Sequence, residues 1–369
     1  MGLATSGYGV SFDMFLLLPT LLRGLLGERY QPQELFRNEE AIMTTMVTGA
    51  TGFLGSALVT ELVKRQEAVS ILARNEKKAR QQFGDTVTII PGDITDAAQV
   101  QQAVDGVTTI YHFAGRLYHP SVPAELYYQT HVEGTRILLE ACQGQAQLQR
   151  IVHVSTTGVH GVTGETPAAE DTPFAPTNPY EATKLEGEQL ALKAYQEQGL
   201  PVTVVRPGLV YGEGDLHLLG FFVSIKKGLF RVIDGGKALL HPVYIDDMLA
   251  AILSCTEHQA LGRTYNIAGD RPVTIRELAT AIAHAMDREL PVGSIPLWLA
   301  NLASDIFAII PGMKGEHAPL TRSRVKFLTN SRIYDISRAR AELGYTPRVE
   351  LEDGMKRTAV WYYKHHYLD

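Results

Sequence analysis

Three glycines spaced by three constrain the fold of this chain more than any other feature of its sequence: Gly49, Gly52 and Gly55. They follow a short apolar run, residues 46–47, and open a helical pattern over residues 53–66. A strand, a glycine turn and a helix in that order let the backbone approach a phosphate, at which the first N–H groups of the helix point. The spacing departs from the standard G-x-G-x-x-G, and a tight turn without a ligand is the alternative interpretation.

Short β-rich runs alternate with helical patterns after the glycine loop. The runs are mostly continuous apolar stretches, which is typical of strands covered on both faces. They span residues 68–73, 87–90, 108–113, 151–155 and 202–206. Helical patterns lie between them at residues 97–105, 122–143 and 179–198. This repetition predicts an α/β fold with a doubly wound parallel sheet.

The strand–helix rhythm breaks after residue 206, and residues 208–236 are loop-rich. We therefore predict a dinucleotide-binding domain over residues 43–206 and a smaller, mainly substrate-binding domain over residues 207–369. Segments near residues 241–268 are expected to return to the sheet of the first domain.

The first 42 residues precede the point where a first strand normally begins. Their leucine-rich stretch, residues 12–26, is interrupted by Asp13, Pro19 and Arg23 and falls far short of the ~20 apolar residues that span a bilayer. An interfacial anchor, a partner-binding segment and a translated leader are the possible interpretations. We expect residues 1–42 to be an accessory, poorly ordered extension.

Composition and charge narrow the functional class. The 369 residues are 45% hydrophobic and 20% charged, as in ordinary globular proteins. A formal net charge of −6 argues against a nucleic-acid surface. The two cysteines, Cys142 and Cys255, provide neither a disulfide framework nor a metal-ligand spacing. We therefore expect a cytoplasmic protein without a metal site.

Residues that follow the second, third and fourth strands can contact a dinucleotide. Arg74 stands where NAD-specific proteins usually place an acid for the ribose 2′-hydroxyl, and it can pair with the 2′-phosphate of NADP. A solvated arginine is the alternative. Asp93 can accept from the adenine amino group, with Ile94 against the ring. Ala114 and Gly115 are small enough for a backbone to approach the cofactor, or they form a plain turn.

The fifth strand leads to Thr156, and 24 residues later a helical pattern contains Tyr180 and Lys184 on one face. A free tyrosine, with a pKa of about 10, is a poor base at neutral pH. A lysine ammonium and the positive nicotinamide of an oxidised cofactor favour the phenolate. We expect Thr156 to bind the substrate oxygen, Tyr180 to exchange its proton and Lys184 to reach the nicotinamide ribose.

Together these pieces make residues 46–365 resemble the extended short-chain dehydrogenase/reductase family, the NAD-dependent epimerase/dehydratase group. The matching motifs are Thr48–Gly55, Gly92–Ile94, His131–Thr135, Ser155–Gly161, Tyr180–Lys184, Arg206–Gly208, Val210–Gly212, His241–Asp247 and Asn266–Gly269. The resemblance implies a Rossmann-type domain, the catalytic set named above, and a nicotinamide flanked by the backbone from Pro207 onward. The glycine-loop residues expected at the cofactor are Gly49, Thr51, Gly52, Phe53, Leu54 and Gly55.

Within this family the chain is most similar to members that resemble 3β-hydroxysteroid dehydrogenases and dihydroflavonol reductases. His131 stands where the family usually has Asn, and His160 stands where sugar-nucleotide epimerases usually have Tyr. Both departures weaken a sugar-nucleotide interpretation. A buried, hydrogen-bonded histidine is the simpler account of each.

Residues 295–310 are almost wholly apolar, with Asn301, Ser304 and Asp305 on one helical stripe. Such a helix packs between domains, covers an apolar substrate or rests on a membrane surface. We predict an NADP-preferring oxidoreductase, with NAD as the other possible cofactor, that acts on a secondary alcohol or ketone of a largely apolar, steroid- or flavonoid-like substrate.

Two alternatives remain open. A nucleotide-sugar epimerase or dehydratase with tightly bound NAD would use nearby cationic groups for a phosphate, namely Arg322, Arg324 and Lys326. The other alternative is a non-catalytic dinucleotide-binding protein. Peripheral membrane contact through residues 12–26 or 295–310, and a homodimer, are further expectations.

Overall fold

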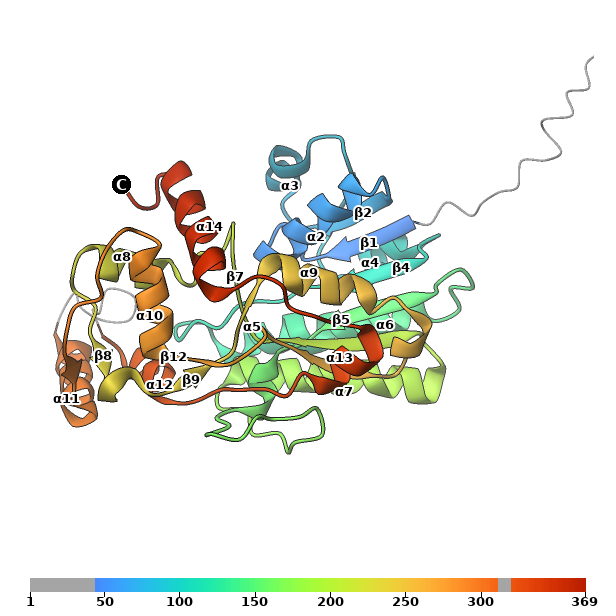
Figure 1. Cartoon of the computed structure of the whole chain (residues 1–369). Coiled ribbons are helices and arrows are strands. Elements are labelled where there is room, and N and C mark those ends of the chain that lie inside the picture. Colours follow the sequence, from blue (N-terminus) through green and yellow to red (C-terminus); the bar gives the residue numbers. More distant parts are fainter. Residues whose placement is uncertain (1–43, 311–319) are drawn as a thin grey trace, which may run out of the picture. The chain divides into compact units, whose positions relative to one another are not determined.

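The computed structural model of the protein describes residues 44–310 and 320–369, so the expectations for residues 1–42 lie outside the described residues. Its main element is a seven-stranded parallel sheet in the order β11-β6-β5-β4-β1-β2-β3 (Figure 1). The strands are β1 (Thr44–Thr48), β2 (Ala68–Ala73), β3 (Thr88–Pro91), β4 (Thr109–His112), β5 (Arg150–Val154), β6 (Val202–Pro207) and β11 (Thr264–Ile267). The predicted doubly wound parallel sheet is confirmed.

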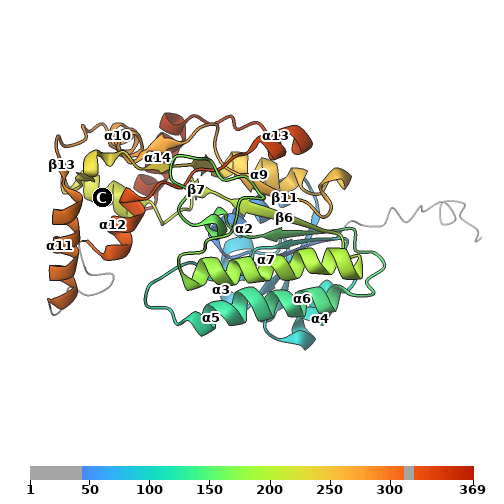
Figure 2. The same ribbon diagram turned by 90° about the horizontal axis from the view of Figure 1, so that it is seen from below.

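Helices cover both faces of this sheet, because successive strand residues point to opposite sides. In β1, Val47 packs in the core under α2 (Phe53–Lys64) and α9 (Ile245–Ser254). The preceding residue, Met46, packs in the opposite core. That core lies under α4 (Ala97–Val104), α6 (Gly134–Cys142) and α7 (Pro179–Gln198), the layer seen in front in Figure 2. Burial on both faces explains the continuous apolar runs of the strands.

The order of the strands reverses at β1, which lies between β2 and β4. The chain progresses toward one edge through β2 and β3 and toward the other through β4, β5, β6 and β11. In doubly wound sheets, ligands bind outside the carboxyl ends of the strands at this reversal, because the loops on either side diverge there. The topology therefore predicts a ligand-binding site at the loops after β1 and β4.

The helix predicted over residues 122–143 is divided in the structure. It consists of α5 (Ala124–Tyr128), a π-helical turn (Gln129–Glu133) and α6. Within the turn, the carbonyl oxygen of His131 lies so close to α7 that a Cβ on Gly187 would be only 2.4 Å from it. A π-helical turn is rare and occurs frequently at functional sites.

The chain after β6 builds three short strand pairs and several helices. The pairs are β7 (Leu209–Tyr211) with β10 (Pro242–Tyr244), β8 (Val232–Ile233) with β13 (Ser294–Ile295), and β9 (Leu239–Leu240) with β12 (Val273–Thr274). The helices after β6, besides α9, are α8 (Leu219–Lys226), α10 (Ile275–His284), α11 (Leu297–Ile309), α12 (Arg322–Thr329), α13 (Ser337–Leu343) and α14 (Leu351–Lys364). Helix α3 (Glu76–Phe83) lies earlier in the chain, between β2 and β3. Helix α8 lies inside the segment predicted to be loop-rich. Residues 43–369 form one compact unit, so the domain boundary at residue 206 stays a prediction.

Helix α11 lies beside α12 (Figures 1 and 2). Most of its apolar side chains are exposed. Of its thirteen residues only Ala300 and Ser304 are buried. The exposed side chains include Trp298 at 68% and Ile309 at 76%, which lie on one stripe with Leu302 and Ile306. These exposed side chains form a continuous apolar stripe along α11.

Candidate active site

The glycine loop joins β1 to α2 at the sheet edge identified by the topology. Gly49 has a φ of +66°, and a Cβ there would lie 2.6 Å from the backbone of Phe113, just after β4. A Cβ on Gly55 would lie 2.4 Å from the carbonyl oxygen of Gly49, so only glycine lets α2 pack this closely. Helix α2 begins after Gly52 without a side-chain cap, whereas α4 is capped by Asp96. Uncapped N–H groups at this point fit the diphosphate of a dinucleotide.

The remaining loop residues predicted at the cofactor lie at the start of α2. Phe53 and Leu54 are partly buried against the core. The ring of Phe53 is close to the turn after β7, where a Cβ on Gly214 would be 3.4 Å from it. The carbonyl of Thr51 accepts a hydrogen bond of 3.0 Å from the ammonium of Lys78, which brings a positive charge to the loop.

Arg74 and Asp93 meet at the carboxyl ends of β2 and β3. The guanidinium Nε of Arg74 lies 3.8 Å from Asp93 Oδ2, and the Arg74 side chain is 63% exposed. Asp93 Oδ1 accepts hydrogen bonds from the backbone N–H and the hydroxyl of Thr95, at 3.0 and 2.9 Å. Most of the Arg74 guanidinium therefore remains accessible to a ligand phosphate.

Ile94, Ala114 and Gly115 lie around the same edge with different exposure. Ile94 is buried, and it sits so close to α6 that a Cβ on Gly134 would be 2.9 Å from its side chain. The Ala114 N–H donates to the hydroxyl of Thr48, at 3.1 Å. Gly115 is exposed. The structure thus gives Ile94 a packing role, and its predicted contact with adenine stays a prediction.

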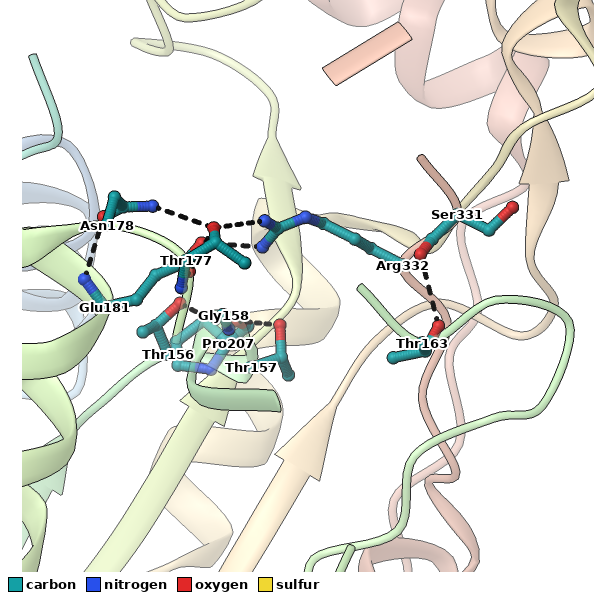
Figure 3. Close-up of polar contacts among 10 residues, drawn as sticks. All are labelled: Thr156, Thr157, Gly158, Thr163, Thr177, Asn178, Glu181, Pro207, Ser331 and Arg332. Carbon is teal, nitrogen blue, oxygen red and sulfur yellow. Dashed lines mark hydrogen bonds and ion pairs between the residues drawn. The ribbon is translucent and has the colours of Figure 1, made fainter. Parts of the chain in front are cut away.

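Thr156 and Tyr180 come together from β5 and α7. Thr156 begins a short 3₁₀ turn, and its hydroxyl accepts the N–H of Gly158 at 3.1 Å (Figure 3). Tyr180 lies in the first turn of α7, which starts at the cap Asn178 with a proline in its first turn. Burial raises the pKa of Tyr180 to about 12, and its interaction with the Thr156 side chain opposes this rise. We expected Lys184 to lower this pKa, but in the protein alone burial dominates and Lys184 makes no such contribution, so the phenol is protonated at neutral pH.

Lys184 is buried one turn after Tyr180. Its ammonium donates to the carbonyl of Val154, the last residue of β5, at 2.5 Å. Burial lowers the pKa of Lys184 to about 8, and the carboxylate of Glu188 opposes this shift. At neutral pH the side chain is therefore charged but easily deprotonated, which suits a group that participates in proton transfer.

His131 packs edge-on against Tyr180, with ring centroids 5.5 Å apart. Its Nε2 accepts the N–H of Arg116 at 2.9 Å, which requires Nδ1 to carry the proton. Nδ1 is 2.9 Å from the hydroxyl of Thr183, on the same helix as Tyr180. Burial lowers the pKa of His131 to about 2, so the ring is neutral. The histidine in the place of the usual Asn is thus buried and hydrogen-bonded on both nitrogens.

A chain of buried hydrogen bonds connects the glycine loop to this histidine. The hydroxyl of Thr48 lies 2.8 Å from Nδ1 of His112, and His112 Nε2 lies 3.0 Å from the hydroxyl of Thr135. Thr135 donates in turn to the carbonyl of His131, at 2.6 Å. The polar groups below the cofactor loop and those below Tyr180 therefore belong to one network.

The structure brings the predicted residues into two groups at the same sheet edge: the glycine loop with residues 113–115, and Thr156 with Tyr180. Pro207 belongs to the second group, because its carbonyl accepts the hydroxyl of Thr157 at 3.0 Å (Figure 3). Sequence reasoning missed the network of His112 and Thr135. The unusual His131 was the only signal of it.

Among residues 44–310 and 320–369, no group of three or more His, Cys, Asp or Glu side chains could hold a metal ion. In the same residues no helix is both long and apolar enough to cross a membrane.

Known proteins resemble the chain in both sequence and fold. A 2-alkyl-3-oxoalkanoate reductase of Stenotrophomonas maltophilia is 30% identical over 336 residues, covering 85% of this chain and 98% of the reductase. A 3-beta-hydroxysteroid dehydrogenase of Mycolicibacterium neoaurum is 29% identical over 336 residues, covering 86% of this chain and 90% of that protein.

A solved structure extends the likeness to the three-dimensional arrangement. The dTDP-glucose 4,6-dehydratase of Streptomyces venezuelae, solved with NAD bound, superposes with a TM-score of 0.71 at 25% identity, covering 89% of this chain and 99% of the dehydratase. The model of the NAD dependent epimerase/dehydratase family matches residues 45–268. The chain therefore belongs to the NAD-dependent epimerase/dehydratase family of extended short-chain dehydrogenases/reductases, whose members are NAD(P)-dependent enzymes.

Proposed function

We propose that the protein is an NADPH-preferring reductase that interconverts a ketone and a secondary alcohol on a largely apolar substrate. The observation that carries the proposal is the meeting of Thr156 and Tyr180 at the carboxyl end of β5, with Lys184 one helical turn away. These are a hydrogen-bond donor, a proton donor and a cation, the set that carbonyl reduction needs.

The chain's own residues account for the proton and for the orientation of the substrate. When bound, the nicotinamide cofactor supplies the hydride for the carbonyl carbon. Thr156 donates a hydrogen bond to the carbonyl oxygen. Tyr180, protonated because burial raises its pKa to about 12, gives its proton to the same oxygen as negative charge develops there. In this proposal, charged Lys184 binds the cofactor ribose and stabilises the resulting phenolate.

The preference for NADPH rests on the charges at the end of β2. Arg74 offers a largely exposed guanidinium, and Lys78 adds an ammonium at the glycine loop. A 2′-phosphate carries a negative charge that both groups attract, whereas a free ribose hydroxyl does not. Asp93 is engaged by Thr95.

The apolar substrate class rests on the relatives. The relatives include a reductase of alkyl oxoalkanoates and a hydroxysteroid dehydrogenase. In favour of the alternative, a nucleotide-sugar epimerase or dehydratase, the solved neighbour acts on a dTDP-sugar, and the exposed Arg322, Arg324 and Lys326 lie on α12.

Replacement of the proton donor tests the proposal. We expect Tyr180→Phe to lower kcat for ketone reduction by about 10²- to 10⁴-fold, because the loss of a general acid has effects of this size. NADPH binding, measured by fluorescence titration, should stay within two-fold. Tyr195→Phe, on the same helix and away from the site, is the matched control and should keep full activity. Full activity of Tyr180→Phe would remove the assignment.

A substrate screen separates the two enzyme classes. Purified protein is supplied with NADPH and steroid-like, flavonoid-like or alkyl ketones, and the fall in cofactor absorbance is followed. A reductase consumes the cofactor stoichiometrically with the ketone. An epimerase or dehydratase returns the hydride, so turnover of UDP- or dTDP-sugars without net cofactor consumption would favour the alternative.

A further inference from the structure

Residues 331–335 form an extended segment, here called the strap, between the loop that precedes α7 and the strand β9. On one side, the N–H of Thr163 donates to the carbonyl of Ser331, and the N–H of Ala168 donates to the carbonyl of Ile333, both at 3.0 Å. On the other side, the N–H of Arg332 donates to the carbonyl of Leu239 at 2.8 Å. The strap therefore ties the chain after α12 to the loop that leads to the catalytic helix (Figure 3).

The side chain of Arg332 points from the strap to the first turn of α7. Its Nη1 donates to Glu181 Oε1 at 2.7 Å, and its Nη2 donates to the hydroxyl of Thr177 at 3.1 Å. The two ends of the ion pair are 22% and 6% exposed, so solvent screens this pair much less than a surface pair. Figure 3 shows the guanidinium spanning both residues.

Glu181 directly follows Tyr180 in the chain, and its side chain is held from several directions. Its Oε2 accepts the N–H and the hydroxyl of Thr177, at 2.6 and 2.8 Å, and its own N–H donates to the cap Asn178 at 3.0 Å. It also packs on the turn that Thr156 begins, because a Cβ on Gly158 would lie 3.0 Å from Glu181 Cγ. The Glu181 side chain therefore lies between the Thr156 turn and the helix start that carries Tyr180.

We propose that Arg332 is a positioning residue for the reaction. By binding Glu181 and Thr177, a pair of contacts here called the grip, it keeps the Tyr180 hydroxyl next to the Thr156 hydroxyl. This inference rests on the proposed function, in which those two hydroxyls act on one substrate oxygen. Arg332 lies 151 residues after Glu181, so the grip makes the catalytic geometry depend on the strap. Misplacement of a catalytic group by about 1 Å can cost about 100-fold in rate.

The kinetic test removes the guanidinium and keeps its volume. We expect Arg332→Met to lower kcat for ketone reduction about 10- to 100-fold while the KM for NADPH stays within three-fold. Arg332→Lys keeps the charge but not the two-point grip, and should recover part of the loss. Arg340→Met is the matched control, because Arg340 forms an exposed pair with Asp270 in the same part of the chain and should retain wild-type kcat.

A double variant tests whether Arg332 acts through Glu181. Glu181→Gln preserves the shape of the side chain and removes its charge. If the two residues form one unit, Arg332→Met combined with Glu181→Gln should cost no more in kcat than the worse single variant. Losses that multiply would show that the two residues act independently and would overturn the proposal.

Hydrogen–deuterium exchange tests the grip without any turnover. We expect Arg332→Met, with and without NADPH, to lose amide protection at residues 177–184 while the strands of the sheet keep theirs. If the wild type reduces no ketone, hydrogen–deuterium exchange still shows whether Arg332 holds the start of α7. A failure of this inference can therefore be distinguished from a failure of the proposed function. If Arg332→Met does not fold, Thr177→Val takes its place, because it removes the hydroxyl that contacts both Arg332 and Glu181 and leaves the ion pair between those two residues. Wild-type kcat together with wild-type exchange at residues 177–184 would overturn the proposal.

Discussion

At the scale of single residues, the proposed preference for NADPH over NADH depends mainly on Arg74. Its guanidinium is 63% exposed and only 3.8 Å from Asp93, a separation too long for a strong hydrogen bond. An exposed pair of this kind contributes little to stability. The side chain can therefore be replaced with little effect on the fold, and its loss should be felt by the ligand.

We expect Arg74→Ala to weaken NADPH binding by about 10- to 100-fold, the size of a lost charge-assisted hydrogen bond to phosphate. NADH binding should change less than three-fold, because NADH has no 2′-phosphate. Isothermal titration with both cofactors measures the two constants. Arg80→Ala on α3 is the control, since Arg80 pairs with Glu76 on an exposed helix face. Equal losses for the two cofactors would contradict the preference for NADPH.

Residues with local partners were predictable, and residues with distant partners were not. Tyr180 and Lys184 could be identified because a helix of period 3.6 places residues four apart on one face. Arg332 could not, since its partner Glu181 is 151 positions away and no local pattern links the two. The raised pKa of Tyr180 also escaped prediction, because burial is a property of the folded chain.

At the scale of elements, the π-helical turn shows the limit of periodicity. An apolar pattern over residues 122–143 indicates a helix but does not show where a wider π-helical turn interrupts it, because such single turns are rare and short. The structure shows what the turn does. It brings the carbonyl of His131 against Gly187 and within reach of the Thr135 hydroxyl, so α6 and α7 pack closely together.

Helix α11 carries a prediction of its own. Asp305, its only charged residue, is neutralised by a two-point pair with Arg322, at 2.6 and 2.8 Å. Basic side chains on the adjacent α12, Lys326 among them, are exposed. An apolar face beside basic groups suits an anionic lipid surface. We expect the protein to co-sediment with vesicles of phosphatidylcholine and phosphatidylglycerol.

Substitution on the exposed stripe should abolish this binding. The variant Leu302→Ser with Ile306→Ser is expected to remain in the supernatant at equal protein concentration, because about two buried apolar side chains are lost from the contact. Val360→Ser on α14, which is 60% exposed, is the control and should sediment like the wild type. If wild type and double variant both stay in the supernatant, and gel filtration shows that only the wild type is a dimer, the face binds a second copy instead.

At the scale of the whole molecule, burial lowers the pKa of five histidines in the described residues, among them His160 and His241, each to about 4. Burial lowers the pKa of His112 to about 3 and of His131 to about 2, and it lowers the pKa of His153 well below 6.5. The unfolded chain binds these protons near pH 6.5 and the folded chain does not. The stability that depends on them is therefore present above pH 6.5 and is lost as the pH falls below it.

Each such histidine should lower the free energy of unfolding by about 2 kcal/mol between pH 7 and pH 5. Urea unfolding at pH 7 and at pH 5 measures the total loss of unfolding free energy from all of these histidines. His153→Leu should reduce the loss by about this amount, because its Nε2 has no hydrogen-bond partner among the described residues and the ring can be replaced by an apolar group. Replacement of the exposed His258 by Leu should leave the loss unchanged.

The sheet as a whole was the most predictable part of the molecule. Strands buried on both faces leave continuous apolar runs, and helices between them force parallel crossovers. The pairs β8 with β13 and β9 with β12 had no such signal, since each has two residues per strand and joins distant segments. The strap could not be predicted for the same reason: the backbone hydrogen bonds that hold it can be made by any sequence, and the partners of the Arg332 side chain lie far away in the chain.

The strap also has a consequence for the way the protein comes into being. Synthesis proceeds from the amino terminus, so a ribosome finishes the sheet strands through β11 and the whole of α7 before it reaches Arg332. A nascent chain can then bury both faces of its sheet while the turn that carries Tyr180 still lacks its brace. That brace becomes available only when roughly the last tenth of the chain is made.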